Sequence, residues 1–149
     1  MKVRSRARDA ALQYLYQAEA NSRHTQETLD SFLVHFIDDD YVKPYARNLV
    51  AGVLNNLQAI DSLIEKATSN WRISRMSRTD RNILRIATYE LAIREDIPYK
   101  VAINEGVELA KRFGSDKCPS FANGVLDKVW MLVSDAVQKT AVKEDLSEE

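Results

Sequence analysis

Basic side chains gather in two stretches of this 149-residue chain and are the clearest candidates for ligand chemistry. The first stretch is the N-terminus, which carries Lys2, Arg4, Arg6 and Arg8. Cations at a helix N-terminus oppose the helix dipole by about 0.3–1 kcal/mol each, so helix stability does not explain them. The chemistry that suits them is phosphate binding, because each contact releases a counterion from a nucleic acid. A solvated basic helix end is the plain alternative.

The second basic stretch lies in the middle of the chain. Its members are Arg72, Arg75, Arg78, Arg81 and Arg85. Taken alone, this stretch is better explained by solvation or by pairing with Asp80 and Glu90. Two basic features in one chain, however, favour an RNA-binding surface.

Composition narrows the class of protein. The net charge is −1, but residues 143–149 carry −3, so the rest of the chain carries +2 and can present a basic surface. The single cysteine, Cys118, cannot form an internal disulfide, which predicts a reducing cytoplasm. The sequence shows neither the apolar region of a signal peptide nor a run long enough to span a bilayer, so we expect no membrane association.

The sequence contains no arrangement typical of an enzyme or a metal site. His24 and His35 are eleven residues apart, which does not place them on one helical face as a metal-binding pair. Cys118 has no histidine near it in sequence that would activate it as a nucleophile. No glycine-rich phosphate loop precedes a helix. We therefore predict a protein without catalytic residues, cofactor or metal.

Helices must position these side chains, because apolar residues recur at helical spacing along most of the chain. We expect an all-α fold of about seven helices, near residues 4–20, 25–37, 42–53, 60–67, 78–91, 98–113 and 121–139. A single bent helix is the alternative to the third and fourth. One domain over residues 1–139 would comprise two packed helical subdomains, about 1–70 and 71–139. Residues 140–149 are expected to form a disordered acidic tail.

Several residues have predicted structural roles. Asp40 and Ser120 are expected to cap the third and last helices, and Gly114 is expected to end the sixth in a left-handed conformation. Phe36 belongs to the predicted apolar stripe of the second helix, and Trp71 is expected to anchor the link after the fourth on the core. The expected core includes Leu15, Phe32, Leu49, Ile64, Ile86, Leu91, Ile103 and Val129.

Three sequence blocks resemble a known family. They read RARDAALQYLYQ over residues 6–17, DRNILRIATYEL over 80–91, and PYKVAINEGVELAKRFG with FANGVLDK over 98–128. In type, order and spacing they are similar to the NusB family of bacterial transcription antitermination factors. The resemblance covers residues from about 4 to about 133.

This resemblance implies a function. NusB proteins are all-helical and bind boxA RNA together with NusE, which is also a small-subunit ribosomal protein. The pair helps to load a termination-resistant complex, with NusA and NusG, onto RNA polymerase, notably on ribosomal RNA operons. Some relatives self-associate through the RNA surface, which allows a homodimer here.

The resemblance also implies RNA-binding residues. They are Lys2, Arg4, Arg6, Arg8, Tyr16, Asp80, Arg85, Lys117 and Phe121. Arginines would contact phosphates, aromatics would stack on bases at about 1–3 kcal/mol each, and the carboxylate would accept from base amino groups. Core packing of Tyr16 and Phe121, capping by Asp80 and pairing of Arg85 with Glu90 are the structural alternatives.

The chain departs from the family pattern at three positions. Ser5 replaces a frequent arginine, which removes about one phosphate contact. Asp80 is one methylene shorter than the usual glutamate, which reduces its reach to a base. Lys117 stands where acidic residues are frequent, which predicts stronger RNA binding.

Two other interpretations compete with an RNA-binding antitermination factor. One is a helical scaffold that binds only protein, and the other is the detached RNA-binding module of an RNA methyltransferase.

Overall fold

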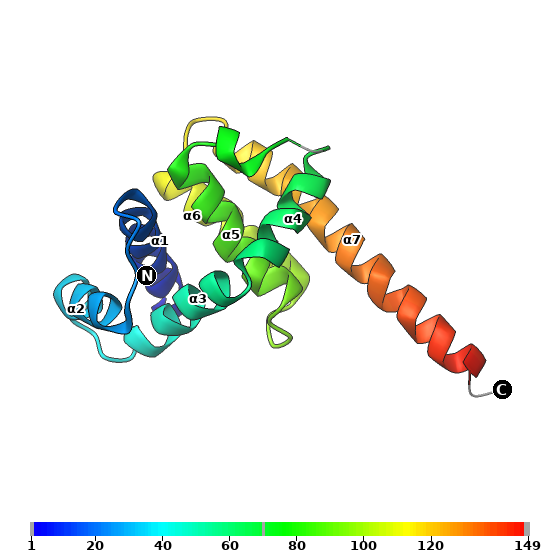
Figure 1. The fold of residues 1–149 in the computed structure, drawn as a ribbon, viewed down its shortest axis with the longest axis horizontal. Coiled ribbons are helices and arrows are strands. Elements are labelled where there is room, and N and C mark those ends of the chain that lie inside the picture. Colours follow the sequence, from blue (N-terminus) through cyan, green and yellow to red (C-terminus); the bar gives the residue numbers. More distant parts are fainter. Residues whose placement is uncertain (1, 70, 148–149) are drawn as a thin grey trace.

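The computed structural model describes residues 2–69 and 71–147, with side chains as far as residue 135. The all-α prediction is confirmed, since the described chain folds into seven α-helices and one short 3-10 helix (Figure 1). In chain order these are α1 (Val3–Ala20), α2 (Gln26–Phe36), α3 (Lys43–Asn55), α4 (Leu57–Ala67), η1 (Ile73–Arg75), α5 (Arg78–Ala92), α6 (Tyr99–Phe113) and α7 (Cys118–Ser147). None of the described helices is long and apolar enough to cross a membrane.

Helix α5 lies at the centre of the molecule. Every residue from Asn82 to Leu91 is buried, so this helix has no solvated face over those turns. It packs against α1, α3, α4, α6 and α7, and Figure 1 shows it among these helices. Helix α4 packs on both α5 and α7, so its contacts cross the predicted division near residue 70. Polar groups on α5 must therefore find partners inside the protein.

The predicted core is largely confirmed. Leu15, Leu49, Ile64, Ile86, Leu91, Ile103 and Val129 are buried. Phe32 is only partly buried and stacks on Phe36, which is 48% exposed. The placement of Phe36 in the core stripe was therefore wrong. Helix α2 packs chiefly on α1, so one neighbour cannot cover its whole apolar face.

The third and fourth helices are separate, as predicted, because α3 ends at Asn55 and α4 begins at Leu57. The capping prediction for Asp40 was wrong. Val42 precedes α3 without a side-chain cap, and Asp40 instead pairs with Lys43 at 2.9 Å.

The turn between α6 and α7 also differs from expectation. Gly114 has extended dihedrals, φ −79° and ψ 173°, so the left-handed cap was wrong. A Cβ on Gly114 would lie 2.7 Å from Cys118 Cβ, so close approach rather than a positive φ favours glycine there. Helix α7 begins at Cys118, which places Ser120 inside its first turn instead of before it.

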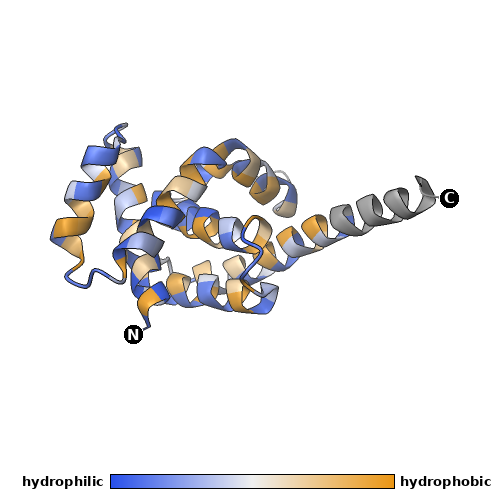
Figure 2. Ribbon diagram, turned by 90° about the horizontal axis from the view of Figure 1, so that it is seen from below, coloured by the Kyte–Doolittle hydropathy of each residue, from blue (hydrophilic) through white to orange (hydrophobic). Residues whose placement is uncertain are grey.

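Helix α7 extends away from the other helices toward the C-terminus (Figure 1). Apolar residues continue along it past its packed turns, where Met131 is 60% exposed (Figure 2). Residues 140–147 of the predicted disordered tail lie in the last turns of α7, residues 148 and 149 lie outside the described residues, and the structure describes no side chain beyond residue 135.

Candidate nucleic-acid interface

A cavity of about 660 Å³ lies between the link before α5, the first turn of α5 and the turn joining α6 to α7. Its lining includes three of the predicted RNA-binding residues, Asp80, Lys117 and Phe121. These residues are up to 41 positions apart in sequence, and the packing of α5 against α6 and α7 brings them to one place. Trp71 and Arg75 line the same cavity.

Asp80 shapes this cavity through its hydrogen bonds. Its carboxylate accepts from the Ser115 backbone N–H at 3.2 Å and from Ser115 Oγ at 2.9 Å. The side chain of Ser77 caps α5 instead, accepting from the Asp80 backbone N–H at 3.1 Å. The carboxylate of Asp80 therefore ties the start of α5 to the turn before α7.

Cys118 also lines the cavity, but its thiol is buried. Burial, together with the neighbouring Asp80 carboxylate, raises the pKa of Cys118 to about 12. The thiol is therefore protonated at neutral pH and unsuited to nucleophilic chemistry. Among the described residues, no group of His, Cys, Asp and Glu side chains is arranged to hold a metal ion.

Aromatic rings stand at the surface of this region. Phe121 is partly buried and meets Trp71 edge to face, with ring centroids 5.4 Å apart. Trp71 is 46% exposed, so its predicted role as a core anchor was wrong. Tyr16 is 41% exposed, and the Arg78 guanidinium lies 5.4 Å from its ring centroid. Exposed ring faces of this kind can stack on unpaired bases.

The N-terminal basic stretch, here called the arginine arm, comprises Lys2, Arg4, Arg6 and Arg8. Its tip, which consists of the first three of these residues, is accessible at the start of α1. Arg6 lies 3.3 Å from Asp39, and its side chain is 42% exposed. Arg4 lies 3.3 Å from Asp96 and 4.6 Å from the centre of the Tyr45 ring. Half-exposed ion pairs are weak because water screens them, so a phosphate can replace either carboxylate.

Arg8, the last member of the arm, is buried. Its Nε and Nη2 donate to the two carboxylate oxygens of Glu90 at 2.6 and 2.8 Å, and its Nη1 lies 3.1 Å from Glu105. The Tyr45 hydroxyl also donates to Glu90. Burial opposes the charge of Arg8, but these carboxylates outweigh it and raise the pKa of the guanidinium. Glu90 is thus the partner of Arg8, not of Arg85.

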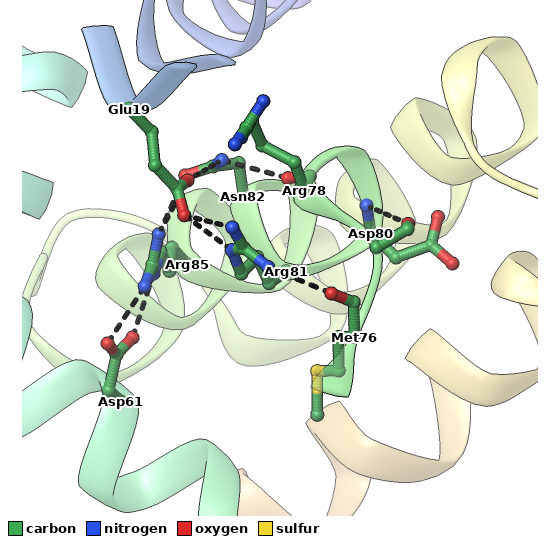
Figure 3. Close-up of polar contacts among 9 residues, drawn as sticks. Glu19, Asp61, Met76, Arg78, Asp80, Arg81, Asn82 and Arg85 are labelled. Atoms are coloured by element: carbon green, nitrogen blue, oxygen red, sulfur yellow. Dashed lines mark hydrogen bonds and ion pairs between the residues drawn. The ribbon is translucent and has the colours of Figure 1, made fainter. Parts of the chain in front are cut away.

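Arg85 is likewise buried and lies in a second ionic cluster (Figure 3). It donates to both oxygens of Asp61 at 2.8 and 2.9 Å and to Glu19 at 3.2 Å. Glu19 also accepts from Arg81 at 2.6 Å and from Asn82 at 2.8 Å. Burial raises the pKa of Glu19, but these donors outweigh it and lower the pKa overall. The structure therefore ties Arg85 to α1 and α4, and Arg85 does not line the cavity with Asp80.

Sequence reasoning overlooked two residues of this surface. Trp71 was assigned to the core, although the stretch around it lacks helical spacing and contains several arginines. Arg75 was noted only as part of a basic stretch, yet it is exposed and lines the cavity. An aromatic residue among arginines in a non-helical link was the available signal.

Comparison with known proteins shows which family the chain resembles. The model of the NusB family matches residues 5–130. The transcription antitermination protein NusB of Desulfotalea psychrophila is 50% identical over 135 residues, covering 87% of this chain and 96% of that protein. The NusB of Bacillus subtilis is 43% identical over 129 residues, covering 87% of this chain and 95% of that protein.

Solved structures that match the chain include members of the same family. T. maritima NusB matches with a TM-score of 0.75 at 38% identity, covering 86% of this chain and 90% of that one. A chain in the crystal structure of the antitermination factors NusB and NusE in complex with dsRNA matches with a TM-score of 0.78 at 28% identity, covering 89% of this chain and 98% of that one. The resemblance inferred from the three sequence blocks is confirmed, and the chain belongs to the NusB family.

Proposed function

We propose that this chain is an RNA-binding transcription antitermination factor that binds boxA RNA together with NusE in the cytoplasm. The observation that carries the proposal is the cavity at the start of α5, where Asp80, Lys117 and Phe121 meet. An acceptor, a cation and an aromatic ring at one opening are the groups that recognise unpaired RNA.

The accessible cations supply the phosphate contacts in this proposal. Lys2, Arg4 and Arg6 bind the backbone at the start of α1, and Lys117 binds it beside the cavity. Tyr16, which is exposed, and Phe121, which lines the cavity, offer stacking faces for bases. An RNA strand that follows this surface has three to five of its phosphate charges neutralised by cations of the protein.

Arg8 and Arg85 have an indirect role in the proposal. Each is buried and holds a carboxylate from another helix, so exposing either to RNA would leave that carboxylate without its partner. Arg8 fixes α1 against α5 and α6, while Arg85 fixes α5 against α1 and α4. Both therefore place the RNA-binding arm rather than contact phosphate.

Named relatives support the assembly part of the proposal. The Desulfotalea and Bacillus proteins are called transcription antitermination proteins, and a structural neighbour is a complex of NusB and NusE with dsRNA. We propose that the RNA-bound pair joins NusA, NusG and RNA polymerase on ribosomal RNA operons. In the free state, self-association through the RNA surface would compete with RNA.

The test is fluorescence anisotropy of labelled boxA RNA and a scrambled RNA, with and without NusE, across a salt series. Three to five contacts on a single strand predict a log–log salt slope of about −2 to −3.5. We expect tighter binding to boxA and further tightening with NusE. Equal, weak binding to both RNAs, unchanged by NusE, would indicate a protein-binding scaffold instead.

Lys117→Asp tests the basic site beside the cavity. The substitution reverses one charge in an exposed turn, so we expect weaker boxA binding and an unchanged fold. Unchanged affinity would remove Lys117 from the RNA surface.

A further inference from the structure

A second, smaller hollow of about 280 Å³ lies beside α1. It is lined by Leu12, Gln13 and Tyr16 from α1, Thr79 from α5 and Phe113 from α6. We infer that this hollow receives one unstacked base of the bound RNA strand, with Phe113 as a stacking face and Gln13 and Thr79 as readers of the base edge. The inference rests on the proposed RNA binding and adds three residues that were not among the predicted contacts.

The walls of the hollow suit an aromatic ligand. Tyr16 is 41% exposed and Phe113 is 37% exposed, whereas Leu12 beneath them is 2% exposed. Two large rings from different helices thus open on one apolar floor. Base–aromatic stacking uses such faces and tolerates any base, because every base has a π-face.

Tyr16 also has a cation beside it. The Arg78 guanidinium lies 5.4 Å from the Tyr16 ring centroid, and Arg78 Nε is buried with no hydrogen-bond partner among the described residues. A guanidinium next to a stacking ring adds a cation–π contribution and attracts phosphate. The arrangement therefore favours a nucleotide over a neutral aromatic molecule.

The polar wall can distinguish one base from another. A glutamine amide has two donors and an acceptor, and a threonine hydroxyl both donates and accepts. Neither Gln13 nor Thr79 makes a side-chain hydrogen bond to another described residue, so both remain available to a ligand. Bases that leave these groups unpaired in the hollow would bind less well.

The hollow lies where an RNA strand would pass. Thr79 lines it, and the next residue, Asp80, lines the larger cavity, so the first turn of α5 separates the two. Along α1, Gln13 is seven residues beyond Arg6, a distance of about 10 Å on an α-helix. A strand bound by the arm can therefore place one base in the hollow and another beside Phe121.

The test is a double-mutant cycle between protein and RNA. Anisotropy is measured with a series of boxA RNAs that each carry one abasic nucleotide, using wild type and Phe113→Leu. We expect the abasic change at one position to weaken wild-type binding about tenfold and to have no further effect in Phe113→Leu. At every other RNA position, the abasic change and Phe113→Leu should weaken binding independently, so that their fold-losses of affinity multiply. Phe36→Leu, at an exposed ring on α2, is the matched control and should behave as wild type.

Gln13→Leu provides a second measurement that does not depend on Phe113. Each of the four bases is placed in turn at the same RNA position, and the affinity of each RNA is measured. Wild type should prefer some bases over others, and the ratio of these affinities should fall at least threefold in the variant. Gln17→Leu, at an exposed site one turn along α1, should retain the wild-type preference. Thermal unfolding of each variant checks that the fold is unchanged.

The outcomes separate this inference from the proposed function. If wild type prefers boxA but Phe113→Leu weakens binding equally at all positions, and Gln13→Leu changes no base preference, the hollow is not a base site and the proposed function stands. If wild type does not bind RNA, both fail.

Discussion

Arg6 and Arg8 lie two residues apart on α1, yet their surroundings differ sharply. The Arg6 side chain is 42% exposed and pairs with one carboxylate at 3.3 Å, whereas the Arg8 side chain is 4% exposed and is held by two. The arm tip can exchange its partner for a phosphate at little cost, but the buried arginine cannot. Burial and partner number, rather than residue type, therefore separate binding cations from structural ones.

Removing Glu90, the main partner of Arg8, should have the largest effect on stability. Glu90→Ala leaves a buried guanidinium without its bidentate acceptor, and we expect the free energy of unfolding to fall by about 3–5 kcal/mol. Urea unfolding followed by circular dichroism measures this change. Glu95→Ala, at an exposed site nearby, should change stability by about 0.5 kcal/mol or less. Equal stability of Glu90→Ala and wild type would show that Arg8 is not anchored.

The second buried cluster should be sensitive to pH. Because the folded state lowers the pKa of Glu19 below its ordinary value of 4.5, its stabilising effect is present above that value and is lost as the pH falls. Glu19→Gln should cost about 1–3 kcal/mol at pH 7. It should also flatten the fall in stability of wild type below pH 4.5. Urea midpoints between pH 7 and pH 3 give both quantities, and parallel curves for the two proteins would contradict the assignment.

At the arm tip, the effect should appear in binding instead of stability. Arg6→Gln removes one phosphate contact, so the salt slope of boxA binding should shrink by about 0.7. Unfolding should change by about 0.5 kcal/mol or less, because the Arg6 side chain is partly solvated. A large loss of stability with an unchanged slope would place Arg6 with Arg8 as a structural residue.

The smallest predicted effect concerns the carboxylate that holds Arg6. Asp39→Asn keeps an acceptor for the Tyr41 backbone N–H but removes the charge that competes with RNA, so we expect boxA affinity to rise about twofold. Asp38→Asn changes the net charge equally at an exposed neighbour for which no ion pair is found among the described side chains. If both variants bind alike, general charge and not the Arg6 pair accounts for the gain.

Much of the fold was predictable because its signals are local. Apolar residues at helical spacing predicted the helices. Asn55 and Asn56, which are poor helix formers, lie where α3 ends and before α4 begins. Caps were less predictable, as Gly114 shows. Gly114 has an extended conformation, and glycine is favoured there because a Cβ would lie too close to Cys118, four residues later.

The site was predictable only in part. The resemblance identified Asp80, Lys117 and Phe121, which the fold brings around one cavity. Trp71 was missed because a large apolar residue in a link is usually buried, and only the tertiary structure shows its ring at the surface.

The helices, the family and the two stretches of arginines, at the N-terminus and around α5, could be predicted because they depend on residue type and short-range spacing. Which of these arginines remain accessible depends on contacts between distant parts of the chain. Arg8 meets Glu90 from 82 positions away, and Arg85 meets Asp61 from 24 positions away. A buried charge must have an opposite charge beside it, and long-range packing alone determines where that partner lies.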